Sequence, residues 1–389
     1  MAPLPQTSPG QAPDLSIRRY FGDLRDPRRA HRRLHRLQDI LVIALCAVIA
    51  GAQDWQQIET FGRRRQDWLR RLLALPHGIP SHDTFERVFD RLKPGAFQAR
   101  FRQWARAVGE ALRVRHVAID GKTLRGSGAA DLGPLHLVSA WATAQHLALG
   151  QVAVDQKSNE ITAIPELLEL LDLHGALVTI DAMGCQKAIA GQIVAGGGDY
   201  VLAVKDNQPT LHEDVHRLFI DGLEDDFAGR EHRYCRTAER GHGRTEVRHY
   251  HLVKVPEELA RKHAAFAGLR TVGMVFSERQ VGDGPASAET RFYISSLDLK
   301  VRTFARAVRS HWGIENNLHW QLDVTFGEDR NRVSKRNAAE NLALLRRLTL
   351  SLLKAHPSKD SIARKRFAAA LDPGFLEEVL RADGILEKP

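Results

Sequence analysis

Cysteine is scarce in this sequence, and its few positions follow no metal-binding or disulfide pattern. The 389 residues include three widely separated Cys residues and no Cys/His spacing typical of a structural zinc site. This excludes a small protein stabilised by disulfides and argues against structural zinc. It favours a reducing, cytosolic environment.

Long hydrophobic runs are also missing. The longest one, residues 40–52, has 13 residues, whereas a membrane span needs roughly 20. It follows an Arg-rich stretch, as the core of a signal peptide would, but it starts late in the chain and has Asp39 at its entrance. We therefore predict a buried core helix and no membrane association.

Acidic side chains are in deficit, with 47 Asp and Glu against 56 Lys and Arg, which gives a net charge of +9. Residues 1–105 hold 18 of the basic and 10 of the acidic side chains, or +8. A basic segment of this kind favours a polyanionic partner, with nucleic acid ahead of a membrane surface.

Composition and periodicity divide the chain into parts. Residues 1–13 are Pro-rich and predict a disordered tail. Residues 14–105 predict a helical domain, with helices at 37–52, 55–75 and 84–92. The turn LPHGIPS between the last two suggests a helix-turn-helix that binds DNA. A plain helical bundle with a solvated Arg surface fits the same pattern.

Residues 106–340 predict an α/β catalytic domain. Three β-type runs are followed by a helix, a strand, a helix and a strand, an order that matches the ribonuclease H-like fold. Hairpin patterns at about 223–298 predict an all-β insertion, and a long helix is expected at 301–322. Residues 341–389 predict C-terminal helices and a tail.

Two carboxylates end apolar strands of this predicted sheet, Asp120 after HVAI and Asp181 after LVTI. A carboxylate in such a place must be paired, metal-bound or solvated, because burying it bare is costly. Either residue alone fits the simpler interpretation of an Asp that caps the next turn.

The third acid comes from the helical periodicity of residues 301–322. At 100° per residue, Glu315 falls in the middle of an apolar stripe, where an acid is expected to be ion-paired or metal-bound. An internal pair with a neighbouring His remains an alternative. Three other acids follow, but Asp323 falls at the edge of the stripe, and Glu328 and Asp329 lie beyond Gly327 in a predicted loop.

Two Asp residues from strands and one Glu from a helix would form an all-oxygen site. Such a site suits Mg²⁺, with Mn²⁺ able to substitute, and two ions could support displacement at a phosphodiester. A basic chain with this site is expected to cut or join nucleic-acid backbones.

Five motifs resemble one family, the DDE insertion-sequence transposases of the H-repeat-associated, ISAs-type group. They are AIDGKTLRGS, TIDAMGCQ, YVLAVKDNQ, RGHGRTEVR and SHWGIENNLHWQLDVTFGEDRNR. The resemblance runs from about residue 17 to 354. It implies a ribonuclease H-like domain with a β insertion and an associated N-terminal domain. It also implies that Asp120, Asp181 and Glu315 are the catalytic and metal-binding triad.

One departure affects the phosphate contacts. Related transposases often carry a Tyr, Arg, Glu, Lys signature on this helix, but the Arg position is His311 here, and Arg309 is an alternative phosphate contact. The cations near the strand ends are expected to hold phosphates, although exposed cations are often merely solvated. The full set of expected DNA-binding residues is Lys122, Arg125, Lys205, Arg244, Arg248, Arg309 and His311.

The sequence thus predicts a cytoplasmic, nucleoid-associated bacterial transposase that acts on double-stranded DNA, both element ends and target. Paired element ends make a homodimer plausible. The alternatives are a ribonuclease H-like nuclease without strand transfer and an inactive DNA-binding relic or repressor.

Overall fold

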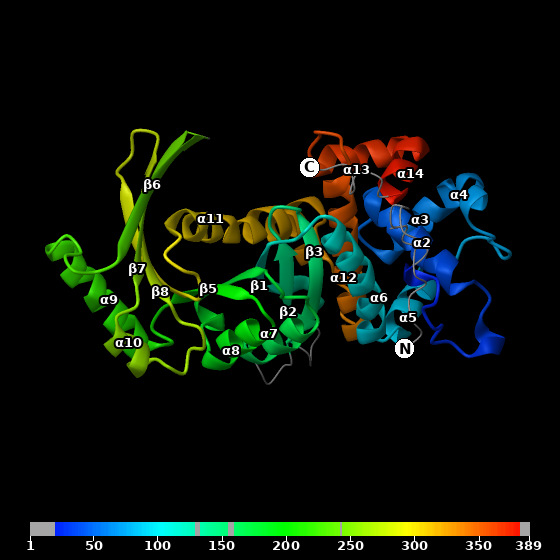
Figure 1. Cartoon of the computed structure of the whole chain (residues 1–389). Coiled ribbons are helices and arrows are strands. Elements are labelled where there is room, and N and C mark those ends of the chain that lie inside the picture. Colours follow the sequence, from blue (N-terminus) through cyan, green and yellow to red (C-terminus); the bar gives the residue numbers. More distant parts are fainter. Residues whose placement is uncertain (1–19, 129–132, 155–158, 242, 382–389) are drawn as a thin grey trace.

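The computed structural model describes residues 20–128, 133–154, 159–241 and 243–381. Its N-terminal and C-terminal helices lie together at one end, a sheet lies in the middle, and a β arm forms the other end (Figure 1). The predicted disordered tail, residues 1–13, lies outside the described residues. Within the described part of the chain, every helix is too short or too polar to cross a membrane.

Nine strands form one continuous sheet in the order β3-β2-β1-β4-β5-β9-β8-β7-β6. β1 pairs antiparallel with β2 and parallel with β4, which in turn is parallel to β5. This confirms the predicted order of three strands, a helix, a strand, a helix and a strand. The first five strands are β1 (His116–Leu124), β2 (Leu135–Ala142), β3 (Leu147–Ala153), β4 (Leu177–Ile180) and β5 (Asp199–Val204).

The β insertion extends the central sheet instead of forming a separate one. Its last strand pairs antiparallel with β5, so the hairpins continue the same ladder outward. It also contains a short helix, α10 (Glu257–Lys262), which the β-hairpin pattern did not predict. Its strands are β6 (His232–Gly241), β7 (Arg244–Lys254), β8 (Thr271–Val281) and β9 (Ser287–Ser295).

Helices cover both faces of the sheet, which explains why β4 and β5 are almost continuously apolar. One face packs against α7 (Glu160–Glu169), α8 (Lys187–Ala195) and α9 (Pro209–Glu224). On the other face lies α11 (Val301–His311), whose Phe304 and Val308 are buried against β5, β7, β8 and β9. The sequence analysis missed α9, although Pro209 in its first turn is a recognised start signal.

The N-terminal and C-terminal helices share one apolar core, which also includes residues of β1, β2 and β3. Helix α12 runs through its centre and is buried along nearly its whole length. The helix predicted at 55–75 is two helices that break at Arg65, and the helix that begins at Pro94 was not predicted. These helices are α2 (Leu37–Ile49), α3 (Trp55–Arg64), α4 (Gln66–Leu72), α5 (His82–Arg91), α6 (Pro94–Ala111), α12 (Arg336–Ala355), α13 (Ile362–Leu371) and α14 (Pro373–Arg381).

Candidate active site

Asp120 and Asp181 lie beside each other because β1 and β4 are parallel neighbours. Ile119 lies opposite Ile180 in the ladder, and each acid occupies the next position of its chain. Burial, opposed by His319 and reinforced by the charge of Asp181, raises the pKa of Asp120 to about 6. The strand side of the site is therefore a pair of carboxylates whose negative charge is poorly compensated.

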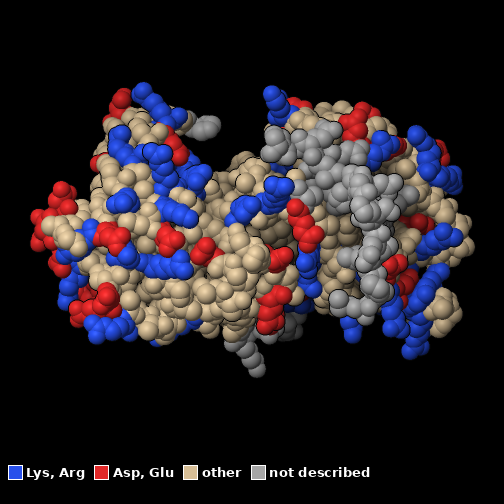
Figure 2. All heavy atoms as spheres, in the orientation of Figure 1, with Lys and Arg blue, Asp and Glu red and all other residues tan. Residues whose placement is uncertain are grey.

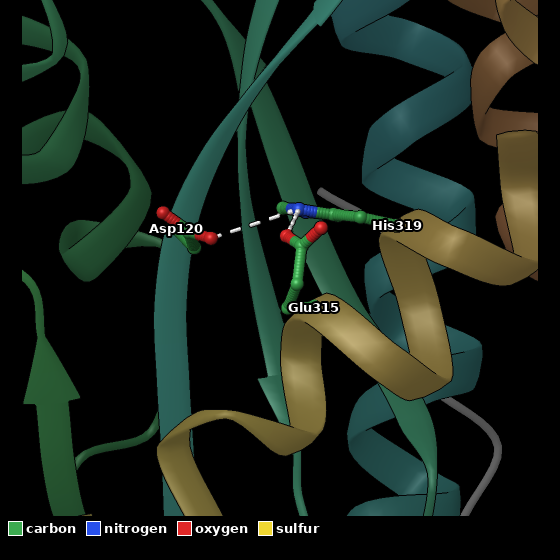
Figure 3. A group of neighbouring side chains, drawn as sticks. All are labelled: Asp120, Glu315 and His319. Carbon is green, nitrogen blue, oxygen red and sulfur yellow. Dashed lines mark hydrogen bonds and ion pairs between the residues drawn. The ribbon is translucent and has the colours of Figure 1, made fainter. Parts of the chain in front are cut away.

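Glu315 reaches the same place from the helical segment that crosses the sheet. After α11 the chain continues in two π-helical turns, η4 (Glu315–His319) and η5 (Gln321–Thr325). His319, four residues after Glu315, belongs to the same π-helical turn. His319 Nδ1 lies 3.2 Å from Glu315 Oε2 and 3.6 Å from Asp120 Oδ2 (Figure 3). The hydrogen bond from His319, opposed by burial, lowers the pKa of Glu315.

The prediction that Glu315 lies in the middle of a buried stripe is wrong. Its side chain is 55% exposed, while Ile314, Leu318 and Leu322 are buried. Trp312, three residues before Glu315, is also exposed. The 100° periodicity fails because the α-helix ends at His311 and π-helical turns follow, which rotates every later side chain.

Glu160 is a further acid of the site that the sequence analysis missed. It stands in the first turn of α7, and its charge raises the pKa of both Asp120 and Asp181, although burial is the larger cause for each. Its Oε1 lies 2.7 Å from Nε2 of His136. A Cβ at Gly121 would lie 2.1 Å from that oxygen, so a larger residue there would displace the Glu160 side chain. No spacing in the sequence connects Glu160 to the strand ends.

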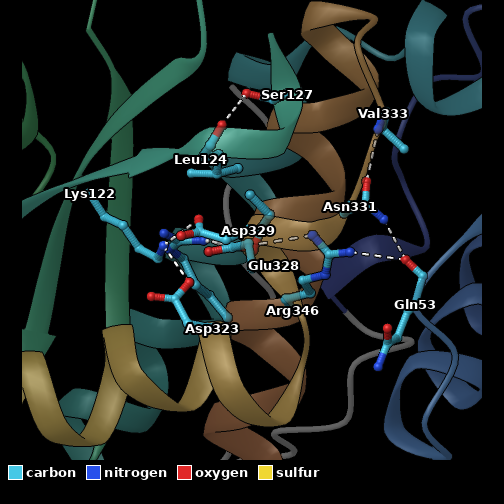
Figure 4. Close-up of polar contacts among 12 residues, drawn as sticks. Gln53, Lys122, Leu124, Ser127, Asp323, Glu328, Asp329, Asn331, Val333 and Arg346 are labelled. Carbon is cyan, nitrogen blue, oxygen red and sulfur yellow. Dashed lines mark hydrogen bonds and ion pairs between the residues drawn. The ribbon is translucent and has the colours of Figure 1, made fainter.

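Lys122, expected to contact phosphate, faces two carboxylates of the segment that follows Glu315. Its Nζ lies 2.6 Å from Asp323 Oδ1 and 3.1 Å from Asp329 Oδ1, and its side chain is buried (Figure 4). Asp323, predicted at the edge of the apolar stripe, is thus ion-paired with this Lys. The three side chains join β1 to the helical side of the site.

Glu328 is buried rather than in a solvated loop. Gly327 has a φ of 63° and ends the π-helical segment, as the sequence indicated. The next residue, Glu328, lies in the short helix η6 (Glu328–Arg330) and is 3.3 Å from Arg347 and 3.9 Å from Arg346, both on α12. Arg346 also donates to the backbone oxygen of Gln53 in the N-terminal helices (Figure 4).

The other cations expected near the triad differ in their surroundings. Lys205 lines the same cleft as the three acids, and its charge lowers the pKa of Asp181, although burial outweighs it. Arg125 is exposed, with its Nε 3.7 Å from Asp329 Oδ2. His311 Nδ1 lies 3.0 Å from the hydroxyl of Thr179, and burial lowers the pKa of His311 to about 4, so its ring is neutral at pH 7.

A second groove continues from this cleft along the β arm. Arg244, Arg248 and Arg309 line it, and it shares Glu315 and Trp312 with the cleft that holds the acids. Glu239 fixes Arg309 by two contacts of 2.8 Å and also lies 3.3 Å from Arg248. Figure 2 shows basic side chains gathered on this arm, beside the notch that separates it from the C-terminal helices.

Two of the acids, together with His319, lie close enough to share a divalent cation. One ligand atom from each of Asp120, Glu315 and His319 lies within 4.8 Å of the others. The raised pKa of Asp120 reports the burial and like-charge repulsion that a bound cation would relieve. Carboxylate-rich sites of this kind polarise phosphodiesters and activate water or hydroxyl nucleophiles when they hold metal ions.

The order β3-β2-β1-β4-β5, with Asp120 inside β1 rather than at its end, Asp181 directly after β4 and a third acid on a helix across the sheet, defines a ribonuclease H-like domain. Comparison with known families then shows that the chain belongs to the family described as "Transposase DDE domain", which matches residues 112–352. The family described as "DDE_Tnp_1-associated" matches residues 18–105.

Several relatives are similar over nearly their whole length. "Putative transposase YncI" of Escherichia coli O157:H7 is 40% identical over 94% of each chain. "H repeat-associated putative transposase YhhI" of Escherichia coli K12 is 39% identical over 92% of this chain and 96% of its own. Among solved structures, a piggyBac transposase synaptic complex with hairpin DNA matches with a TM-score of 0.40 and 11% identity, over 96% of this chain and 79% of that one.

Proposed function

We propose that this protein is a DNA transposase that binds the ends of its insertion element, hydrolyses a phosphodiester to free a 3′-hydroxyl, and joins that hydroxyl to target DNA. The observation that carries the proposal is the convergence of Asp120, Asp181 and Glu315 on one cleft. Family membership and the whole-length relatives named as transposases support it.

The three acids are proposed to hold two Mg²⁺ ions, with Mn²⁺ able to substitute. Bound there, the ions would supply charge for the attacking and leaving oxygens of an in-line displacement. Asp120 is the proposed shared ligand, because it neighbours Asp181 across β1 and β4 and has a ligand atom within 4.8 Å of one of Glu315. Lys205, in the same cleft, is proposed to hold the scissile phosphate in line.

The partner is proposed to be double-stranded DNA, with a strand lying in the groove of the β arm and ending at the acids. Arg244, Arg248 and Arg309 are the proposed phosphate contacts there, with Arg125 near the other end of the cleft. Because Glu239 already orients Arg248 and Arg309, they would lose little side-chain freedom on binding. His311 is neutral, so its proposed contact would be a hydrogen bond rather than an ion pair.

The division of labour along the chain is also a proposal. Residues 14–105, with most of the net charge, would add affinity for DNA, residues 106–340 would carry the chemistry, and residues 341–389 would join the two through the shared core. Two element ends brought together would require two active sites, which makes a homodimer on bacterial nucleoid DNA the simplest assembly.

The test uses the full chain and a DNA substrate that carries the terminal inverted repeats found beside its coding region. Wild type should cleave the end and transfer it in Mg²⁺. Asp120→Asn, Asp181→Asn and Glu315→Gln should each lose at least about 10²–10³-fold in rate, a typical loss when one charge-stabilising group is removed. Glu258→Gln, an exposed acid on α10, is the control and should behave as wild type.

The outcomes separate the alternatives. Cleavage without strand-transfer product would identify a nuclease and contradict transposition. Specific binding without any metal-dependent cleavage would identify an inactive relic or repressor. Near wild-type cleavage by a triad variant would remove that residue from the triad.

A further inference from the structure

His319 is a buried imidazole whose polar contacts are directed into the acidic cleft. Its side chain is 4% exposed, and Nδ1 lies between the carboxylates of Glu315 and Asp120 (Figure 3). Its other nitrogen, Nε2, is buried and has no hydrogen-bond partner among the described residues. The two acids therefore provide the polar environment of this side chain.

The separations match those of ligands that share one ion. Two atoms bound at about 2.0–2.2 Å and at right angles to each other are about 3 Å apart, and two on opposite sides are about 4.2 Å apart. Nδ1 of His319 lies 3.2 Å and 3.6 Å from its two carboxylate oxygens, and all three atoms lie within 4.8 Å of one another. A small shift of the exposed Glu315 side chain would complete the arrangement.

The helix geometry supports this arrangement. Glu315 and His319 lie four residues apart in the π-helical turn that begins at Glu315, and both side chains are directed toward Asp120. Single π-helical turns inside helices are frequent at functional sites.

We infer that His319 is a direct metal ligand, so that Asp120, Glu315 and His319 hold one ion through two oxygens and one nitrogen. Asp120 and Asp181 would hold the other ion through oxygen alone. The inference rests on the proposed function and deepens it, because the sequence predicted a site made only of oxygen atoms.

The nitrogen ligand has a consequence for the choice of metal. Mg²⁺ prefers oxygen ligands and gives up its water reluctantly, whereas divalent transition ions accept imidazole nitrogen. One of the two positions should therefore prefer Mn²⁺ to Mg²⁺, and that preference should depend on His319.

The test adds Mn²⁺ alone to the full-length protein without DNA and records pulsed electron paramagnetic resonance. Wild type should show coupling of the bound Mn²⁺ to an imidazole ¹⁴N. In protein labelled with ¹⁵N-histidine, that signal should be replaced by a ¹⁵N coupling. This measurement needs no variant, so it does not depend on whether a substitution at a buried position folds.

Variants then assign the signal. His319→Gln should abolish the ¹⁴N coupling and weaken Mn²⁺ binding by about tenfold or more, a loss in the range seen when a metal site is perturbed. The same substitution should weaken Mg²⁺ binding less, so the ratio of Mn²⁺ affinity to Mg²⁺ affinity should fall. His136→Gln, a neighbouring imidazole paired with Glu160, is the matched control and should keep the coupling.

The result separates this inference from the proposed function. If wild type binds Mn²⁺ through Asp120 but shows no histidine nitrogen coupling, or if the coupling survives in His319→Gln, His319 is not a ligand and the metal site of three acids stands. If Mn²⁺ binds wild type no better than it binds Asp120→Asn, the proposed metal site itself fails, and this inference fails with it.

Discussion

The two sides of the acidic cleft are fixed in place by different forces. On the strand side, Asp120 and Asp181 are positioned by backbone hydrogen bonds of a parallel ladder, and their pKa values are raised mainly by burial. On the helical side, Glu315 is half-exposed, and its pKa is lowered chiefly by its hydrogen bond to His319.

The helical side depends on ion pairs that a sheet does not need. Lys122 attaches the segment after Glu315 to β1, and Glu328 attaches it to α12 through two buried Arg residues. Most surface substitutions leave the hydrogen bonds of a β ladder intact. Removing one partner of a buried ion pair is strongly destabilising, because the other charge stays buried without its counterion. We therefore expect substitutions near the site to move Glu315 out of the cleft more easily than Asp120 or Asp181.

The largest effect is expected from Glu328→Gln. It leaves Arg346 and Arg347 buried without their anion, and breaking a buried pair in this way costs about 3–5 kcal/mol. The midpoint of denaturant unfolding should fall accordingly with an unchanged slope. Asp360→Asn, an exposed acid in the loop before α13, should change the free energy of unfolding by less than about 0.5 kcal/mol. Equal losses of stability in both variants would show that the ion pairs of Glu328 with Arg346 and Arg347 have no special role in stability.

On the strand side, Asp120→Asn should stabilise the metal-free protein. The pKa of Asp120 is raised from 3.8 to about 6, so the folded state binds more protons than the unfolded state between about pH 4 and pH 6. Stability should therefore fall as pH rises through this window, and the full cost of about 2–3 kcal/mol should be present above pH 6.

Denaturant unfolding of wild type and Asp120→Asn at pH 4, 5, 6 and 7, in the presence of a chelator, measures this difference. The gain from Asn should be small at pH 4 and largest at pH 7. If the gain in the free energy of unfolding does not change with pH, it comes from a change in side-chain packing and not from removal of the Asp120 charge.

Lys122 lies between the strand side and the helical side of the cleft, paired with Asp323 and Asp329. Lys122→Met should reduce the cleavage rate by about 10–100-fold, the range expected when a residue that positions metal ligands is lost. The dependence of DNA affinity on salt should stay as in wild type, because the ammonium faces Asp323 and Asp329 rather than solvent. Arg125→Met is the matched comparison, since Arg125 is exposed and proposed to contact phosphate. If Lys122→Met lowers the salt slope by about 0.9 instead, Lys122 is a phosphate contact as the sequence predicted.

The smallest effect concerns the groove beyond the cleft. Arg244→Gln should weaken DNA binding similarly for all sequences and reduce the salt slope by about 0.9, the value of one phosphate contact. Arg261→Gln on α10, which lies outside this groove, should leave the slope unchanged. Binding isotherms at several salt concentrations give the slope for each variant. Equal slopes for Arg244→Gln and Arg261→Gln would show that the DNA does not lie in this groove.

The isolated N-terminal segment illustrates how tertiary structure changes an expectation. Its net charge of +8 over residues 1–105 favoured nucleic acid as a partner of this segment. Its helices share a core with α12 and with residues of β1, β2 and β3, so the fragment would expose apolar surface that the full chain buries. Charge variants of the whole protein are therefore the better test of its role.

The sequence by itself predicted the strands, their order along the chain and the acids Asp120 and Asp181, although it placed Asp120 at the end of β1, which continues to Leu124. An Asp at an apolar run is a local feature, whereas the pairing of β1 with β4 spans β2, β3 and α7 and exists only in the folded sheet. The sequence also indicated Glu315, on motifs and on a periodicity that proved wrong in detail.

Only the tertiary structure decided how Glu315 is presented, that His319 and Glu160 belong to the site, and that Lys122 faces two carboxylates. The physical reason is the same in each case. A change from α-helical to π-helical turns rotates side chains without a local sequence signal that we recognised. Lys122 and Asp329 are separated by 207 positions and meet only after folding. Their contact depends on the packed geometry of the whole domain, which residue patterns along the chain do not encode.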